Sequence, residues 1–306
     1  MQVILAQPRG FCAGVVRAIR AVDQALESYG KPVYVLHEIV HNRHVVEDLK
    51  RRGALFIESL GEVPVGAVTI FSAHGVSTAV VKEAEKRKLR VIDATCPLVT
   101  RVHFRAQEFS RQGFDVIIIG HPGHPEVEGT RGRVKGPVYV LSSRAEVATL
   151  GVRHPERLAC VTQTTLSMDD TLEVIEALKA RFHIQGPDLS NICYATQTRQ
   201  NSVRRLAKSI DLLLVVGARN SSNSNRLREV GERSGVLAYL IEDAEDLNPA
   251  WFSVNARVGI TAGASAPEEM VQKVLDRLRT YYPCTVREMA SEPEPMHFSS
   301  TPSLGL

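Results

Sequence analysis

The sequence predicts an α/β protein built from three similar α/β units, here called repeats, and two observations support this prediction. First, apolar strands alternate with helical stretches, as in parallel βαβ connections. Second, a short turn that carries a cysteine precedes a helical stretch three times, at Cys12, Cys96 and Cys193. The spacings of 84 and 97 residues (96 − 12 and 193 − 96) indicate the repetition of a whole α/β unit rather than of a short solenoid motif.

The expected elements follow this order in each repeat. The first repeat (1–96) is expected to contain strands at 3–6, 32–36, 67–71 and 90–92 and helices at 15–26, 43–52 and 78–88. The second (97–193) is expected to contain helices at 98–112 and 168–181 and strands at 114–119 and 158–161. The third (194–282) is expected to contain helices at 195–209 and 268–281 and strands at 212–216 and 257–260. The tail 283–306 is rich in Pro, Ser and Glu, and its end is expected to be disordered or loosely attached.

Composition excludes several classes of protein. The 306 residues are 44% hydrophobic and 23% charged, which is typical of a globular protein. Lys+Arg 37 against Asp+Glu 34 gives a net charge of +3, too balanced for a general nucleic-acid-binding protein. No apolar run approaches the roughly 18–20 residues of a membrane span, and we see no signal peptide. Five cysteines do not make a disulfide framework, so we expect a reduced, cytoplasmic protein.

The three repeated cysteines are candidate ligands of one metal centre. Three converging thiolates suit an iron–sulfur cluster or a zinc ion, and spacing alone does not choose between them. A [4Fe–4S] cluster with three protein ligands would leave one iron open as a Lewis acid, whereas zinc would be hydrolytic. Simple packing is the alternative for any single thiol. It is expected for Cys160, inside an apolar strand, while Cys284 is given no role.

Polar loops recur at matching distances after the cysteines. His41, His124 and Ser221 lie 29, 28 and 28 residues beyond them (41 − 12, 124 − 96, 221 − 193). Ligands of open α/β sheets bind beyond the carboxyl ends of the strands, and unpaired N–H groups at helix starts favour anions. These loops therefore predict a phosphate or diphosphate pocket, whose donors are His41, His74, His124, Thr164, Thr165, Ser221, Ser222, Asn223 and Ser265.

Helix capping is the alternative role for the serines of this set and its neighbours. Ser77, Ser167 and Ser265 each precede a predicted helix, where a serine side chain can accept a backbone hydrogen bond.

Glu126 is a candidate proton donor. It follows His124 in the same loop, and a carboxylate in an anion pocket is unfavourable unless it carries a proton. The alternative is an exposed loop glutamate. His103 and His121 are expected to be structural or exposed.

Nine motifs together point to one family. They are 8–15 (PRGFCAGV), 39–42 (IVHN), 73–77 (AHGVS), 93–97 (DATCP), 123–126 (GHPE), 163–167 (QTTLS), 192–196 (ICYAT), 220–227 (NSSNSNRL) and 261–267 (TAGASAP). On these motifs the chain, from Gln7 to about Tyr282, resembles the 4-hydroxy-3-methylbut-2-enyl diphosphate reductases of the methylerythritol phosphate route to isoprenoids.

The resemblance implies pseudo-threefold symmetry around a central [4Fe–4S] cluster, one per chain. It implies that Cys12, Cys96 and Cys193 hold three irons and that the fourth binds the substrate hydroxyl. Thr164 and Glu126 would orient and protonate the leaving hydroxyl. Two electrons, from a donor such as ferredoxin or flavodoxin, and two protons would give isopentenyl and dimethylallyl diphosphate plus water. The implied diphosphate ligands are His41, His74, Ser221, Asn223 and Ser265, with His124 and Ser222.

Two other functions remain to be considered. A quinolinate-synthase-like dehydratase also arranges three α/β units around a three-cysteine cluster, but its substrate lacks a diphosphate. A binding protein of a different class, stabilised by zinc or a cluster, could sense a phosphorylated ligand, and Glu126 would then be dispensable.

Overall fold

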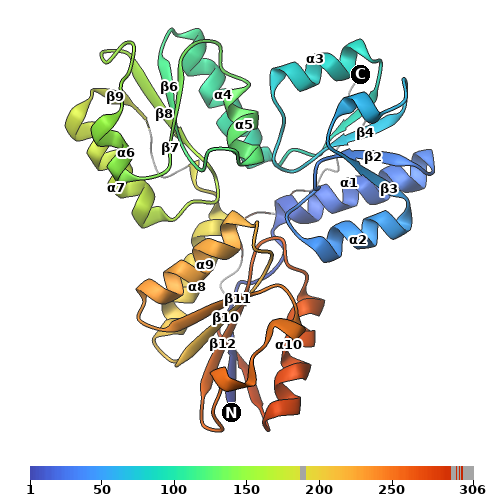
Figure 1. The fold of residues 1–306 in the computed structure, drawn as a ribbon, viewed down its shortest axis with the longest axis vertical. Helices are drawn as coiled ribbons and strands as arrows, with labels where there is room; N and C mark the ends of the chain where they lie inside the picture. Colours follow the sequence, from blue (N-terminus) through green and yellow to red (C-terminus); the bar gives the residue numbers. More distant parts are fainter. Residues whose placement is uncertain (187–190, 291–293, 295, 297, 299–306) are drawn as a thin grey trace. The chain divides into compact units, whose positions relative to one another are not determined.

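The computed structural model describes residues 1–186, 191–290, 294, 296 and 298. These residues form an α/β protein with three separate sheets (Figure 1), in which every strand pairing is parallel. The predicted fold class of three similar α/β units is therefore confirmed. Parallel strands need crossover connections, and the helices between the strands supply them.

The first four-stranded sheet has the order β3-β2-β4-β5. Its strands are β2 (Val33–Leu36), β3 (Ala54–Ile57), β4 (Val68–Phe71) and β5 (Arg90–Asp93). The accompanying helices are α1 (Ala13–Tyr29), α2 (Arg43–Arg52) and α3 (Thr78–Lys86). Leu36, Ile57 and Phe71 are buried in one core with Ala84 of α3, so the apolar strand residues hold this helix on the sheet.

The second four-stranded sheet has the order β7-β6-β8-β9. Its strands are β6 (Asp115–Ile119), β7 (Val138–Leu141), β8 (Leu158–Thr162) and β9 (Ile184–Gln185). Its helices are α4 (Pro97–Arg111), α5 (Pro125–Arg131), α6 (Arg144–Thr149) and α7 (Met168–Arg181). Ile117 and Ile119 pack with α7, while Val116 and Ile118 pack with α4. Both faces of β6 are thus covered, which explains its continuous apolar run.

The five-stranded sheet has the order β11-β10-β12-β1-β13. Its strands are β1 (Gln2–Leu5), β10 (Leu212–Val216), β11 (Leu237–Ile241), β12 (Arg257–Ala262) and β13 (Thr285–Glu288). Its helices are α8 (Tyr194–Ala207), α9 (Ser222–Arg233) and α10 (Glu268–Tyr281). One core packs α10 against the sheet, and another packs α8 and α9 against its other face.

The first strand of the chain and a strand from the predicted tail both lie in this sheet. Strand β1, which the sequence grouped with the first repeat, pairs in parallel with β12 and β13. Strand β13 lies within the predicted tail, so the beginning of that tail is part of the fold. The end of the tail, expected to be disordered or loosely attached, lies outside the described residues.

By compactness the chain divides into two bodies, which we describe separately. The five-stranded body comprises Met1–Ala13, His41–Val45 and the described residues of Tyr194–His297. The double-sheet body comprises Gly14–Val40 and the described residues of Val46–Cys193 and holds both four-stranded sheets.

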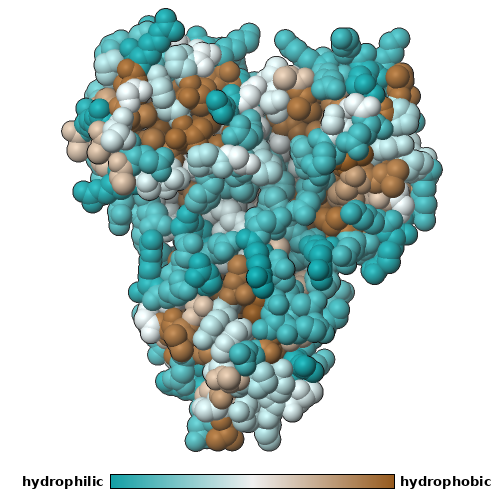
Figure 2. Space-filling model, viewed as in Figure 1, coloured by the Kyte–Doolittle hydropathy of each residue, from teal (hydrophilic) through white to brown (hydrophobic). Residues whose placement is uncertain are grey.

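The face in Figure 2 is mostly hydrophilic, with apolar side chains in separate groups. Within the described parts of the chain, no helix combines the length and the apolar character needed to cross a membrane.

Candidate functional site

The Cys12 loop lies at the carboxyl end of β1 in the five-stranded body. The Gly10 N–H donates to Ala262 O at 3.1 Å, and the Cys12 N–H donates to Ala264 O at 3.1 Å. Gly10 has a φ of +69°, and a Cβ there would lie 3.2 Å from Ala266 O. Glycine is therefore needed for the loop to approach the loop after β12, which carries Ser265.

The Cys96 and Cys193 loops are held in the same way in the double-sheet body. The Cys96 N–H donates to Ala73 O at 3.0 Å, beside His74, and the Cys193 N–H donates to Thr164 O at 3.0 Å. Both cysteines are half-buried, as is Cys12. Each repeated cysteine is thus hydrogen-bonded to a loop that the sequence predicted to belong to the site.

The remaining two cysteines have different surroundings. Cys160 is 1% exposed in β8, and burial raises the pKa of its thiol well above the ordinary value, so its predicted role in packing is confirmed. Cys284 is half-buried before β13, and burial raises its pKa as well. A thiol that resists ionisation is a poor metal ligand.

No set of three His, Cys, Asp or Glu side chains that could hold a metal ion is grouped among the residues that the structure describes. Cys12 belongs to the five-stranded body, and Cys96 and Cys193 belong to the double-sheet body.

One set of predicted donors gathers in the five-stranded body, and we call it the hydroxyl–amide cluster: His41, Ser221, Asn223 and Ser265. Ser265 Oγ donates to His41 O at 2.9 Å, and the Ala264 N–H donates to Asn223 Oδ1 at 2.9 Å. Asn220 Nδ2 lies 3.5 Å from His41 Nδ1. Ser222 is the first residue of α9, directly after Ser221. The structure therefore joins three loops that are distant in sequence.

Asn223 presents an unused donor within this cluster. Its Nδ2 is buried, and no hydrogen-bond partner for it lies among the residues that the structure describes. A buried amide without an acceptor is costly, so the site is suited to an acceptor-rich ligand such as a phosphate oxygen.

The other set lies in the double-sheet body, and we call it the carboxyl cluster: His124, Glu126 and Thr164. The Thr164 N–H donates to Glu126 Oε1 at 2.7 Å, and Thr164 Oγ1 lies 3.1 Å from Glu126 Oε2. Glu126 is only 3% exposed, so it is not the exposed loop glutamate of the alternative prediction. Burial raises its pKa to about 7, although the two hydrogen bonds from Thr164 lower it.

His124 connects this cluster to His74. The Glu126 N–H donates to His124 Nδ1 at 3.1 Å, which caps α5 and leaves the ring proton of neutral His124 on Nε2. The His74 and His124 rings meet edge to face with centroids 5.9 Å apart. Ser72 Oγ lies 3.2 Å from His74 Nδ1.

The ring of His103 lies against the loop that carries His74. A Cβ on Gly75 would lie 2.5 Å from His103 Cε1, so the loop of His74 rests directly on this ring. Burial lowers the pKa of His103 to about 4, and the neutral ring is therefore the form expected at pH 7. The structural role that the sequence allowed for His103 agrees with its position, although its contact with Gly75 could not be read from spacing.

The capping alternative holds for two of the three serines. Ser77 Oγ accepts from the Val80 N–H at 3.3 Å, and Ser167 Oγ accepts from the Asp170 N–H at 3.3 Å. The N-cap of α10 is Pro267, whereas Ser265 donates to His41 O. Ser265 therefore links two loops of the cluster and does not cap a helix.

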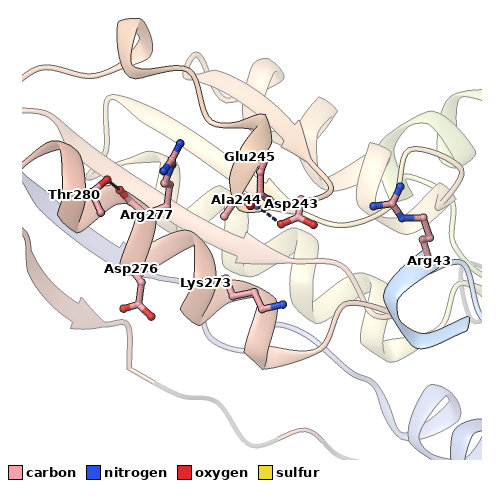
Figure 3. Close-up of a pocket in the computed structure, with 8 residues that line it drawn as sticks. All are labelled: Arg43, Asp243, Ala244, Glu245, Lys273, Asp276, Arg277 and Thr280. Carbon is pink, nitrogen blue, oxygen red and sulfur yellow. Dashed lines mark hydrogen bonds between the residues drawn. The ribbon is translucent and has the colours of Figure 1, made fainter. Parts of the chain in front are cut away.

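A charged pocket of about 680 Å³ in the five-stranded body lies beside η3 (Ala244–Asp246) and α10 (Figure 3). Its lining includes three basic residues, Arg43, Lys273 and Arg277, and three acidic residues, Asp243, Glu245 and Asp276. None of the predicted site residues lines it, and three carboxylates oppose an anionic ligand.

Two arginines that donate hydrogen bonds to the cysteine loops were not predicted from the sequence. Arg199 is fully buried and donates to Gly10 O at 2.8 Å, and Arg17 donates to Thr95 O at 2.9 Å. They lie 6 and 5 residues after a cysteine (199 − 193 and 17 − 12), which is the one feature of the sequence that could have identified them.

Comparisons with known proteins agree along nearly the whole chain. A family model described as LytB protein matches residues 3–279. The 4-hydroxy-3-methylbut-2-enyl diphosphate reductase of Acidithiobacillus ferrooxidans is 57% identical over 301 residues, covering 98% of this chain and 95% of the relative. The enzyme of the same name from Xanthomonas axonopodis pv. citri is 56% identical over 312 residues, covering 100% of this chain and 99% of the relative.

Solved structures give the same result. The E-1-hydroxy-2-methyl-but-2-enyl-4-diphosphate reductase from Plasmodium falciparum has a TM-score of 0.90 and 37% identity, covering 96% of this chain and 94% of that chain. A structure of (E)-4-hydroxy-3-methyl-but-2-enyl diphosphate reductase, described as the terminal enzyme of the non-mevalonate pathway, has a TM-score of 0.66 and 34% identity. It covers 91% of this chain and 99% of that chain.

Proposed function

The chain belongs to the LytB protein family, and on this premise we propose that it acts as a 4-hydroxy-3-methylbut-2-enyl diphosphate reductase. It removes the hydroxyl of its allylic substrate reductively and forms isopentenyl and dimethylallyl diphosphate. The structural observation that carries the proposal is the Glu126 carboxyl, which Thr164 holds by two hydrogen bonds and whose burial keeps part of it protonated at neutral pH.

Cys12, Cys96 and Cys193 are the proposed ligands of one [4Fe–4S] cluster per chain. Soft thiolates suit iron–sulfur irons, and these three cysteines follow strand-end loops, whereas Cys160 is sealed in a strand. When bound, such a cluster supplies electrons and a Lewis-acidic iron for the substrate hydroxyl. The electrons are proposed to come from a carrier protein such as ferredoxin or flavodoxin. All five cysteines are in the reduced thiol state, which is consistent with a reducing, cytoplasmic location.

Glu126 is proposed to supply the proton that the departing hydroxyl needs. With a pKa of about 7, a substantial part of the carboxyl is protonated at neutral pH. The proton can lie on Oε2 and be donated to Thr164 Oγ1, at 3.1 Å, and the Thr164 hydroxyl can then donate to the substrate. The Thr164 N–H holds Oε1 at 2.7 Å and so fixes the orientation of the carboxyl.

The diphosphate is proposed to bind His41, His74, Ser221, Asn223 and Ser265, with help from His124 and Ser222. The buried Nδ2 of Asn223 supports this assignment, because a phosphate oxygen would satisfy it. Ser221 and Ser222 begin α9, whose N-terminal N–H groups favour an anion.

The decisive experiment is turnover by the purified protein, reconstituted without oxygen with iron and sulfide and supplied with the diphosphate and a chemical reductant. We expect both isomeric products and consumption of two electrons per substrate. A cluster-loaded protein that binds the diphosphate without turnover would support the sensor function instead. Loss of water without consumption of reductant would support the dehydratase.

Iron and sulfide analysis of cysteine variants tests the ligands separately. Cys12→Ser, Cys96→Ser and Cys193→Ser are expected to lose or destabilise the cluster, because oxygen is the poorer ligand for these irons. Cys160→Ser and Cys284→Ser are the matched controls and are expected to retain it. An intact, active cluster in the Cys96→Ser protein would contradict the assignment.

A further inference from the structure

We propose that Arg199 and Arg17 are positioning residues that fix the backbone immediately before two of the three cysteine ligands, Cys12 and Cys96. Each arginine lies on the helix that follows a different cysteine from the one it supports. The inference rests on the proposed cluster ligands. The arginine contacts are nevertheless tested in the cluster-free protein, so that a failure of the contacts and a failure of the cluster assignment can be told apart.

Arg199 uses two of its three guanidinium nitrogens for this purpose. Its Nε and Nη2 donate to Gly10 O at 3.1 and 2.8 Å, and Nη2 also lies 3.4 Å from Phe11 O. These are the two carbonyls that precede Cys12. Its Nη1 donates to Ala195 O at 3.0 Å and pairs with Glu294 at 2.6 Å.

The burial of Arg199 makes this arrangement costly to disturb. The side chain is 0% exposed, and a buried cation is tolerated only when it is paired and hydrogen-bonded. The carboxylate of Glu294 balances its charge from the C-terminal segment. Removal of the guanidinium would therefore leave both the loop carbonyls and a carboxylate without their donor.

Arg17 makes the corresponding contact in the double-sheet body. Its Nη1 donates at 2.9 Å to Thr95 O, the carbonyl directly before Cys96. The Thr95 N–H donates to Asp93 Oδ1 at 2.9 Å, and the Thr95 hydroxyl binds the same oxygen. The residue before Cys96 is thus held on both its N–H and its carbonyl side.

Together the two contacts connect the helix of one repeat to the cysteine loop of another. Helix α1, after Cys12, supports the loop before Cys96, and helix α8, after Cys193, supports the loop before Cys12. A guanidinium on these carbonyls fixes the direction of the cysteine and adds a positive charge near its thiolate. Hydrogen bonding and net charge near the sulfurs both influence the reduction potential of an iron–sulfur cluster.

Hydrogen exchange of the cluster-free protein tests the contacts without any cluster. In Arg199→Gln we expect the amides of Gly10 and Cys12 to exchange at least about tenfold faster while the Cys96 amide is unchanged, and the reverse pattern in Arg17→Gln. Arg204→Gln on α8 and Arg20→Gln on α1 are the matched controls. If both Gln variants exchange like wild type at their own loop, the proposal is wrong.

Measurements on the cluster-loaded protein test the effect on the metal centre. Arg199→Gln and Arg17→Gln are expected to release iron to a chelator about 10–100-fold faster than wild type, as is typical when the groups that orient metal ligands are lost. The reduction potential should fall in both Gln variants and recover in Arg199→Lys and Arg17→Lys, which keep the charge. Unchanged potential and iron release in both Gln variants would overturn the role. If wild type takes up no cluster, the proposed function fails, and hydrogen exchange still decides this inference.

Discussion

The hydroxyl–amide cluster and the carboxyl cluster occupy comparable strand-end loops, yet their chemistry differs. The first cluster, with Ser265 and Asn223, offers hydroxyl and amide groups, and its donor Asn223 Nδ2 is buried with no hydrogen-bond partner among the residues that the structure describes. The second buries a carboxyl, Glu126, with two donors from Thr164. Two hydrogen bonds do not offset full burial, so the pKa of Glu126 rises to about 7. The same type of loop is thus proposed to serve binding in one body and proton transfer in the other.

Glu126→Gln has the largest expected effect. Gln keeps the shape and can hydrogen-bond Thr164, but it has no proton to transfer, so turnover should fall at least about a hundredfold with near-normal substrate affinity. Steady-state kinetics of the cluster-loaded variant measure both quantities. Glu128→Gln, in the exposed part of the same helix α5, is the control. Turnover within about threefold of wild type would show that Glu126 is not the acid.

Asn223→Ala and Ser265→Ala should affect binding instead. Each hydrogen bond to a charged group contributes roughly 1.5–3 kcal/mol, so substrate affinity should weaken about tenfold to a hundredfold while turnover at saturation changes little. Calorimetry with the diphosphate substrate and with its alcohol separates the affinity due to the diphosphate from that due to the rest of the substrate, because the alcohol should bind poorly to wild type and to both variants. Normal affinity in both variants would remove the diphosphate from this cluster.

The pH dependence of turnover should follow the carboxyl cluster. Above about pH 7 the proton of Glu126 is lost, so turnover at saturating substrate should fall up to about tenfold per pH unit where this step limits the rate. A profile of turnover against pH measures the midpoint. A flat profile up to pH 9 in the wild type would separate Glu126 from the limiting proton transfer.

The stability of the folded protein should also depend on the ionisation of Glu126. The folded pKa of Glu126, about 7, is raised above the ordinary value of 4.5. The contribution of Glu126 to the free energy of unfolding is therefore fully present below about pH 4.5. It is progressively lost as the pH rises to about 7, because the carboxyl ionises more easily in the unfolded chain. The melting temperature of wild type relative to Glu126→Gln should fall across this window. A constant difference between the two proteins would argue against a buried neutral carboxyl.

Ser167→Ala has the smallest expected effect. Ser167 caps α7, so its loss should cost about 1 kcal/mol of unfolding free energy. Substrate affinity and turnover should stay unchanged, because this oxygen already accepts from the Asp170 N–H. Denaturant unfolding measures the loss of stability, and steady-state kinetics measure substrate affinity and turnover. A weakened substrate affinity would place Ser167 in the binding site.

The sequence by itself determined the α/β class, the three strand-end loop systems and the distinction between Cys160 and the repeated cysteines. The α/β class follows from the alternation of strands and helices, because parallel strands need crossover connections. A continuous apolar run such as β6 indicates a strand that is buried on both faces. The nine motifs also fixed the family, since each carries chemistry-bearing residues in a short local pattern that needs no knowledge of distant contacts.

Tertiary structure alone decided what depends on contacts between distant segments. The pairing of β1 with β12 and β13 joins residues more than 250 positions apart (257 − 2), and local periodicity holds no information about such a partner. Burial likewise decided the chemistry of Glu126 and His103, because the pKa of each depends on the segments that exclude water from it. Folding alone buries Arg199 of α8 against the carbonyls that precede Cys12, and the sequence analysis gave this residue no role.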